Sequence, residues 1–318
     1  MKNKIKILVL SLTVLATMVV TAQEKKQIIK TLIVDGQNNH VQWPKITHLL
    51  KEQMEATGLF TVDVARSAYT WQGKEFISEY PIDGLPTTIA LEKPKTDQDF
   101  NPDFSKYDLV ISNFGWNAAP WPEATQKNFE KFIAEGGGLV VFHAADNSFP
   151  KWEAYNKMIG LGGWGDRTEK DGPYVYYNDA GELIRDNSPG KGGSHGPELE
   201  YQIKIRNTEH PITKGMPEVW MHTKDELYNS LRGPAENMEI IATAYAEPTS
   251  RHEPALMVLN YGDGRVFHNI MGHIDYSVAC VGFLTSMLRG AEWAATGEVT
   301  QAIPDDFPTA NKSSSKKF

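Results

Sequence analysis

The sequence predicts an α/β protein with a mainly parallel sheet, helices on both faces and a single domain. In the first half of the chain, short runs of β-branched residues alternate with segments whose apolar residues recur at helical spacing. In addition, His40, His143 and His273 each follow such a run. Ligands of open α/β sheets bind beyond the carboxyl ends of the strands, so these positions predict one polar pocket. A chain of 318 residues is long enough to bury the required core.

The first half of the chain predicts strands joined by crossover helices. The predicted strands cover 28–34, 60–65, 107–112 and 139–142, and the predicted helices cover 44–57 and 123–135. Helices of this length between strands favour parallel pairing. The polar, turn-rich stretch over 69–102 is expected to be a long excursion from the sheet.

The second half is less regular. Residues 160–196 are rich in Gly, Pro, Asp and Asn, and a loop of that length inside a domain is usually functional or disordered. Further strands are predicted at 199–205, 238–245, 255–260 and 264–270, followed by a helix over 276–296. The Ser/Lys-rich tail over 309–318 is predicted to be disordered.

Residues 1–22 have the pattern of a secretory signal peptide. Lys2, Lys4 and Lys6 precede an apolar stretch over 7–20, and Ala22 provides a small residue at a plausible cleavage point. We therefore expect an exported, periplasmic protein whose domain spans 23–308, without stable membrane insertion after cleavage. An uncleaved anchor is the alternative.

The net charge and the cysteine content argue against a nucleic-acid-binding protein, an intramolecular disulfide and a cysteine nucleophile. A net charge of -8 and a pI near 5.6 argue against nucleic-acid binding, which needs a basic surface. Cys280 is the only cysteine, so an intramolecular disulfide is impossible. Its sequence neighbours are apolar, and no basic residue adjoins it to lower its pKa, so we expect a packing residue rather than a nucleophile.

Four residues are the predicted catalytic groups: His143, Glu226, His222 and His273. His143 stands where a strand turns toward a helix, as in a nucleophile elbow, but carries an imidazole instead of a hydroxyl or thiol. It could be a general acid or base, or a metal ligand. His222 and Glu226 are four residues apart and share a face whether the segment is helical or extended. Glu226 could instead be a surface charge.

The predicted substrate-binding residues surround the same crevice. Asn39 and His40 end the first strand, although Asn39 could instead cap the following helix. Trp43, Trp116 and Trp164 could stack on sugar faces or belong to the core. Asp146 could orient His143 or cap a helix. The set is completed by Arg167, His195, His252 and Glu253.

No nucleotide cofactor is expected, because the segment after the first strand lacks the glycine and lysine spacing of a phosphate loop. No Cys/His zinc spacing or His-Glu-x-x-His pattern occurs either. A divalent metal held by distant loops stays open, as does homo-oligomerisation.

Several segments together resemble the ThuA-like, or trehalose-utilisation, family. They are 34–40, 136–145, 210–212, 225–228, 262–273 and 289–294, and in order they cover most of the chain from 28 to 299. The resemblance implies a flavodoxin-like fold similar to class I glutamine amidotransferases. His143 then stands where those enzymes carry cysteine, so glutaminase activity is not expected. It also implies a role in disaccharide catabolism, alongside oxidation of sugars to 3-keto forms. Residues 160–200 form a longer segment here than in shorter members.

Two functions follow from these patterns. The first is an enzyme of disaccharide or glycoside catabolism, with hydrolase, lyase or isomerase chemistry on a glycoside or 3-keto-glycoside. A ketone acidifies neighbouring C–H bonds, and histidine and carboxylate groups suit the proton transfers that follow. The alternative is a non-catalytic, exported sugar-binding or accessory protein. Either has a small-molecule carbohydrate as its partner, and the number of imidazoles favours the enzyme.

Overall fold

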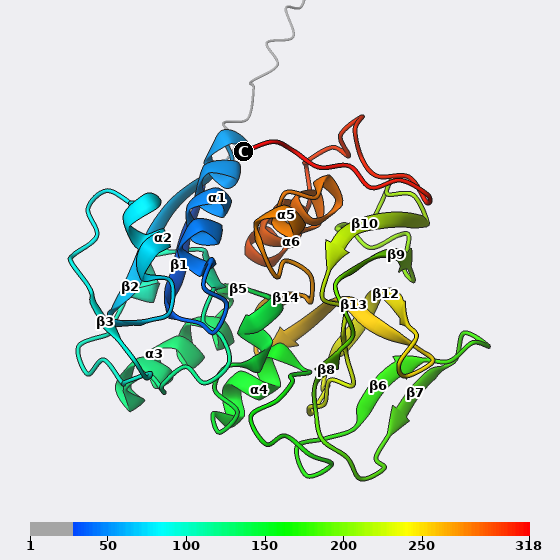
Figure 1. The fold of residues 1–318 in the computed structure, drawn as a ribbon, viewed down its shortest axis with the longest axis horizontal. Coiled ribbons are helices and arrows are strands. Elements are labelled where there is room, and N and C mark those ends of the chain that lie inside the picture. The colour runs from blue at the N-terminus through cyan, green and yellow to red at the C-terminus, as the bar shows by residue number, and fades with distance from the viewer. Residues whose placement is uncertain (1–27) are drawn as a thin grey trace, which may run out of the picture.

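The computed structural model describes residues 28–318, and it has one large sheet flanked by helices (Figure 1). Neighbouring strands follow the order β10-β9-β12-β13-β14-β5-β4-β1-β2-β3. The pairs from β14 to β3 are all parallel, while the pairs from β10 to β14 are antiparallel. The predicted α/β fold with a parallel central sheet is therefore confirmed, and an antiparallel extension continues it.

The parallel half contains the buried strands. They are β1 (Ile29–Gln37), β2 (Phe60–Trp71), β3 (Ile89–Leu91), β4 (Leu109–Ser112), β5 (Gly138–Phe142) and β14 (Gly264–Asn269). β1, β4 and β5 are buried along almost their whole length because helices cover both faces of the sheet. The strand order reverses between β1 and β4, which places a crevice beyond their carboxyl ends.

Helices cover both faces, as predicted. Figure 1 shows α1 (Trp43–Ala56), α5 (Asp275–Val278) and α6 (Val281–Thr296) on one face, and α3 (Glu123–Ala134) and α4 (Glu153–Ile159) on the other. Pro44 lies in the first turn of α1, where its missing N–H costs nothing. Gly297 ends α6 in the left-handed conformation, with φ of 84°.

The antiparallel extension consists of β9 (Leu199–Ile205), β10 (Val219–Asp225), β12 (Met238–Ala246) and β13 (Arg251–Tyr261). The hairpin of β6 (Tyr174–Tyr177) and β7 (Leu183–Asp186) is attached to β13. β8 (Ser194–His195) pairs with β11 (Tyr228–Asn229) in a separate small ladder. The segment over 160–196 is thus partly regular, contrary to its composition.

Three predicted elements differ in detail. β2 continues to Trp71, and the expected excursion contains α2 (Lys74–Glu79) and β3. The single helix predicted over 276–296 is divided into α5 and α6.

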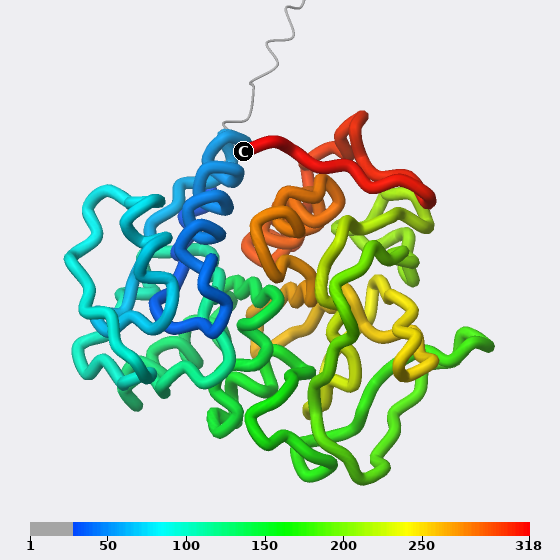
Figure 2. Tube along the Cα trace, viewed as in Figure 1, coloured from blue at the N-terminus to red at the C-terminus, as the bar shows by residue number. Residues whose placement is uncertain are grey.

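The tail over 309–318, predicted to be disordered, instead packs along the domain (Figure 2). Met221 donates its N–H to the Thr309 carbonyl, and Val281 donates to Ser314, each at 2.8 Å. These main-chain hydrogen bonds hold the tail in place despite its polar composition, which had predicted disorder.

The predicted signal peptide, residues 1–22, lies outside the described residues. Within 28–318, no helix is both long enough and apolar enough to cross a membrane.

Candidate functional site

Four titratable side chains converge beyond the carboxyl ends of the parallel strands. His40 follows β1, His143 follows β5 and His273 follows β14, while Glu226 follows β10. One nitrogen or oxygen atom from each lies within 4.8 Å of those of the other three. The ring centroids are 4.9 Å apart for His40 and His143, 4.6 Å for His40 and His273, and 5.2 Å for His143 and His273. We call these four residues the His/Glu cluster.

The loop after β1 is tied to its neighbour β4 by asparagines. The Asn38 side-chain oxygen accepts the His40 N–H at 2.9 Å, and its amide donates to the Asn113 carbonyl at 3.3 Å. Asn113 in turn donates to the Trp43 carbonyl at 3.0 Å. These bonds fix where His40 enters the crevice.

His143 sits in a strained turn at the end of β5, with φ of 40°. Positive φ is uncommon for a residue with a side chain and often marks a functional position. Its Nδ1 lies 2.9 Å from the Ile270 carbonyl oxygen, which can only accept, so the ring proton is on Nδ1. Nε2 is then a lone-pair nitrogen, and it is buried without a hydrogen-bond partner among residues 28–318. The Tyr228 ring stacks against the imidazole at 4.2 Å.

Asp225 holds the strand end that carries Glu226. The register of β10 against β9 shifts between His222 and Asp225, a bulge that turns the chain toward the crevice. The fully buried Asp225 carboxylate accepts the N–H groups of Glu226 at 2.9 Å, Gly272 at 2.8 Å and His273 at 3.2 Å. His222 Nε2 also lies 2.8 Å from it. One carboxylate therefore positions two members of the cluster.

His273 is carried by a turn that requires glycine. Gly272 has φ of 104°, and a Cβ there would lie 2.7 Å from the Phe283 ring. His273 Nδ1 is 2.9 Å from Glu198 Oε1, and Nε2 faces Glu226 Oε2 at 3.9 Å. His143 Nε2 is also 3.9 Å from that same oxygen.

Burial sets the charge of the cluster. Burial and the neighbouring His273 and His195 lower the pKa of His40 to about 3. Burial, with His40 and His273, also lowers the pKa of His143 well below its usual value. Burial raises the pKa of Glu226, although His273 and His195 act in the opposite direction. The site thus combines two imidazoles that favour the neutral form, those of His40 and His143, with a carboxylate that holds its proton more tightly than usual.

His222, predicted to be catalytic, is not a member of the cluster. It is fully buried behind Asp225 and beside Cys280. Burial opposes its charged form, but Cys280 and Asp225 outweigh burial and raise the pKa of His222 to about 9. Burial likewise opposes the Cys280 thiolate, yet His222 lowers the pKa of the thiol. The expectation that no basic residue adjoins Cys280 is therefore wrong. With 0% exposure, Cys280 still has no access to a substrate.

Four of the predicted substrate-binding residues border the cluster. His195 Nδ1 lies 3.6 Å from Glu226 Oε1, and the side chain is partly exposed. The Trp164 ring packs against Tyr228 at 4.8 Å and against His195 at 5.9 Å. The Asn39 side-chain oxygen, next to His40, accepts the main-chain N–H of Trp116 at 3.0 Å. Trp116 itself is 42% exposed.

The other five predicted substrate-binding residues have structural partners instead. Trp43 has 0% exposure, and the Arg66 guanidinium lies 4.8 Å from its ring, so no face is left for a sugar. Asp146 is buried against His268 at 3.2 Å rather than against His143. Arg167 is also buried, and it donates to the Gly163 and Ser148 carbonyls and to Asn156.

His252 and Glu253 begin β13, outside the cluster. His252 pairs with Tyr177 of β6 and lies 3.7 Å from Asp179. Glu253 is 2% exposed and accepts a hydrogen bond from Thr249 at 2.9 Å.

Sequence reasoning missed Tyr228, Asp225 and Glu198 as members of the site. Tyr228 and Asp225 flank Glu226 in one short segment, and that proximity was the available signal. Glu198 follows an irregular segment and carries no comparable signal.

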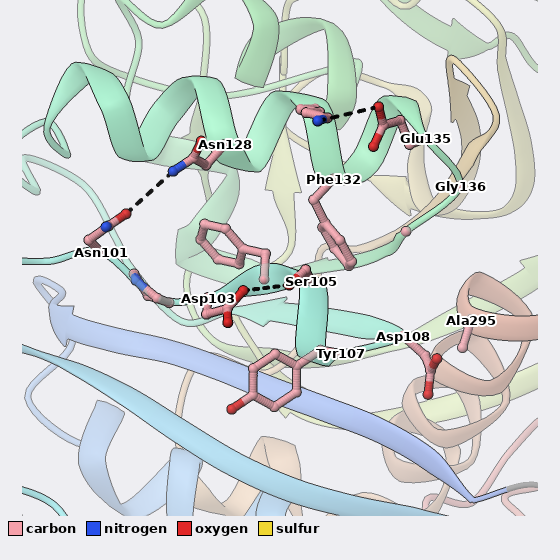
Figure 3. Close-up of a pocket in the computed structure, with 14 residues that line it drawn as sticks. Asn101, Asp103, Ser105, Tyr107, Asp108, Asn128, Phe132, Glu135, Gly136 and Ala295 are labelled. Carbon is pink, nitrogen blue, oxygen red and sulfur yellow. Dashed lines mark hydrogen bonds and ion pairs between the residues drawn. The ribbon is translucent and has the colours of Figure 1, made fainter.

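Two cavities bear on the location of the site. The cavity in Figure 3, of about 640 Å³, is lined by residues such as Asp108 and Gly136 that precede β4 and β5. It therefore opens at the amino ends of the strands, away from the cluster. A second cavity of about 540 Å³ is lined by Trp116, Asn147 and Trp152. Asn147 donates to the Tyr228 hydroxyl at 3.2 Å, which links this cavity to the ring behind His143.

Fold and site together define an α/β protein of flavodoxin-like type, with a histidine/carboxylate cluster at the carboxyl ends of its parallel strands. The sequence profile of the ThuA family, described as trehalose utilisation, matches residues 84–294. The chain belongs to the ThuA family. No curated protein sequence matches it.

Solved structures agree with this assignment. A ThuA-like protein from Parabacteroides merdae is 40% identical, with a TM-score of 0.79, over 91% of this chain and 98% of the other. A ThuA-like protein from Bacteroides uniformis is 17% identical, with a TM-score of 0.51, over 86% of this chain and 94% of the other. The second likeness shows the fold alone.

Proposed function

We propose that this protein is an enzyme of disaccharide or glycoside catabolism that performs proton-transfer chemistry on a 3-keto-glycoside. Membership of a trehalose-utilisation family supports a carbohydrate as the substrate class. The observation that carries the chemistry is the position of Glu226 among His143, His195 and His273. Titratable groups with opposing pKa shifts in one crevice are typical of acid–base sites.

Glu226 is the proposed general base. Burial raises its pKa toward the operating pH, which is the condition for efficient proton transfer. His143 was an equal candidate from the sequence, but its pKa is shifted far below neutrality, so it is a weak base. We assign His143 to holding a group rather than to moving a proton.

The proposed step is an elimination. A ketone acidifies the C–H bond on the carbon between it and the anomeric carbon. Glu226 takes this proton, the C–H electron pair becomes a carbon–carbon double bond, and the bond from the anomeric carbon to the glycosidic oxygen breaks. His195, which is partly exposed and 3.6 Å from Glu226, returns a proton to the departing oxygen. The products are an unsaturated keto sugar and a free alcohol, and addition of water to the former completes hydrolysis.

The cavity of about 540 Å³, which is connected to the cluster through Asn147 and Tyr228, suits the rest of such a substrate. Trp116 lines it with 42% of its surface exposed, and exposed aromatic faces bind sugar rings. Its link to Tyr228 through Asn147 supports this cavity as the proposed site of a second sugar unit.

The test is turnover of glycosides and their 3-keto derivatives by the full chain, with products identified by mass spectrometry. Glu226→Gln is expected to lower the rate by about 10²–10⁴-fold. His252→Ala, at the start of β13, is the matched control and should keep the wild-type rate. Binding of the keto sugar without any product would instead favour the non-catalytic accessory protein.

The His143 position supports a relation to class I glutamine amidotransferases. The strained turn at the end of β5 has the form of a nucleophile elbow. An imidazole there supplies no acyl acceptor, and Cys280 is buried, so we propose a fold relative without glutaminase activity.

We further propose that the protein acts after export. The charged, apolar and small-residue order over 1–22 supports cleavage after Ala22. Amino-terminal sequencing of protein from the native envelope should begin at Gln23; a cytoplasmic chain beginning at Met1 would overturn this.

A further inference from the structure

We propose that His40, His143 and His273 bind one first-row transition-metal dication such as Zn²⁺, with Glu226 closing the coordination shell when no substrate is bound. The proposal deepens the proposed function of the same site, but metal binding can be measured without it.

The first support is convergence from separate elements. The donor atoms come from loops after β1, β5, β10 and β14, and they lie within 4.8 Å of one another. Ligands at about 2.0–2.1 Å from a tetrahedral ion are roughly 3.4 Å apart. The 3.9 Å separations of Glu226 Oε2 from His143 Nε2 and His273 Nε2 need only small side-chain movements to match.

The second support is the unpartnered nitrogen of His143. The Ile270 carbonyl places the ring proton on Nδ1, so Nε2 presents a lone pair. Within the described part of the chain, Nε2 is buried without a hydrogen-bond partner, and it lies 3.9 Å from Glu226 Oε2. An unsatisfied buried acceptor destabilises the folded protein, and a bound cation would remove that cost.

The third support is the surroundings of the ligands. A metal-binding histidine usually contacts a carboxylate or carbonyl through its other ring nitrogen. His143 has the Ile270 carbonyl in this position, and His273 has Glu198 at 2.9 Å. Glu198 is itself held by the Tyr276 hydroxyl and by Lys224 at 3.4 Å. Both Nε2 atoms face Glu226 Oε2, each at 3.9 Å.

The donor set selects the class of metal. Three imidazoles and one carboxylate suit Zn²⁺, Fe²⁺ or Ni²⁺, whereas Mg²⁺ and Ca²⁺ prefer shells of oxygen. An ion there would polarise a sugar carbonyl or hydroxyl next to the base Glu226.

The test is metal binding by the full chain after removal of metals with a chelator. Titration with Co²⁺, followed by its visible absorption, and competition with Zn²⁺ should give one equivalent. His143→Ala and His273→Ala should each weaken binding by at least about 100-fold. His48→Ala, on α1 beside Glu52, is the matched control and should bind as the wild type does. Circular dichroism checks folding. If an alanine variant fails to fold, the glutamine substitution at the same position, His143→Gln or His273→Gln, replaces it.

Glu226→Gln separates this proposal from the proposed function. It should still bind one Co²⁺, with affinity reduced by about 10-fold or less, while losing turnover. Loss of turnover with metal retained supports both proposals, whereas metal binding with full turnover overturns only the assignment of Glu226. No binding by the wild type, or equal binding by the histidine variants, would overturn the metal site.

Discussion

The rings of His143 and Tyr228 lie almost face to face, with centroids 4.2 Å apart and planes inclined by 29°. Tyr228 thereby blocks rotation of the imidazole on the side away from the cluster. The Tyr228 hydroxyl accepts a bond from Asn147 at 3.2 Å, which fixes the ring in turn. The side chain that orients His143 thus follows Glu226 by two residues in the sequence.

Replacement of Tyr228 should therefore weaken the site without removing a ligand. Tyr228→Leu is expected to lower Co²⁺ affinity by about 10–100-fold, the usual cost of losing a group that orients a ligand. Tyr228→Phe keeps the stacked ring and should stay within about 3-fold of the wild type. Titration of chelator-treated protein measures both. Equal affinities for the Leu and Phe variants would show that stacking does not orient His143.

Asp225→Asn should damage both stability and the site. The carboxylate accepts main-chain bonds from Glu226, Gly272 and His273, and it supports the buried His222. An amide cannot accept all of these bonds, so the free energy of unfolding should fall by about 3 kcal/mol. Urea unfolding measures this loss, and Asp263→Asn on the surface is the control. A change below about 0.5 kcal/mol would contradict the role given to Asp225.

Glu253→Gln should change how stability depends on pH. Burial raises the pKa of Glu253, although Thr249 and the Ser230 main chain act in the opposite direction. The folded protein then retains a proton that the unfolded chain releases above about pH 4.5. The contribution of Glu253 to stability is therefore greatest at low pH and is lost as pH rises through its raised pKa.

The glutamine variant should gain stability relative to the wild type between pH 4.5 and pH 7.5, as measured by urea unfolding at both values. A constant difference at the two values would contradict the raised pKa. Because Glu253 lies outside the His/Glu cluster, turnover of the variant should match the wild type.

The sequence predicted which strand ends would meet, because apolar runs ending at His40, His143 and His273 belong to parallel strands. Glu226 was predicted from its spacing to His222, yet its place in the site depends on the bulge at Asp225. Period-two alternation does not reveal such a bulge, so His222 was expected beside Glu226 rather than behind it.

Burial explains most of the remaining misassignments. Asp146, Arg167 and Glu253 are polar residues near turns, a pattern shared by ligand-binding residues and by internal hydrogen-bonded groups. Only the folded structure reveals the partner of each: His268, Asn156 and Thr249. Trp43 lies in the first turn of α1, and its ring stacks on Arg66 in the core. A tryptophan that stacks on a sugar can have the same sequence neighbours, so the sequence did not distinguish the two roles.

Removal of residues 309–318 should destabilise the fold and uncover Cys280. Lys316 donates its N–H to the Ala279 carbonyl at 2.9 Å, and Val281 donates to Ser314 at 2.8 Å, so the tail pairs with the main chain on both sides of Cys280. Loss of these bonds and of the Thr309 contact should lower the free energy of unfolding by about 2–3 kcal/mol, at about 1 kcal/mol each.

The Cys280 thiol, with 0% exposure in the intact chain, should then react faster with an aromatic disulfide reagent under native conditions. Removal of the exposed Phe318 alone is the matched control and should change neither quantity. Unchanged labelling and stability after removal of all of 309–318 would mean that the tail does not hold this part of the molecule together.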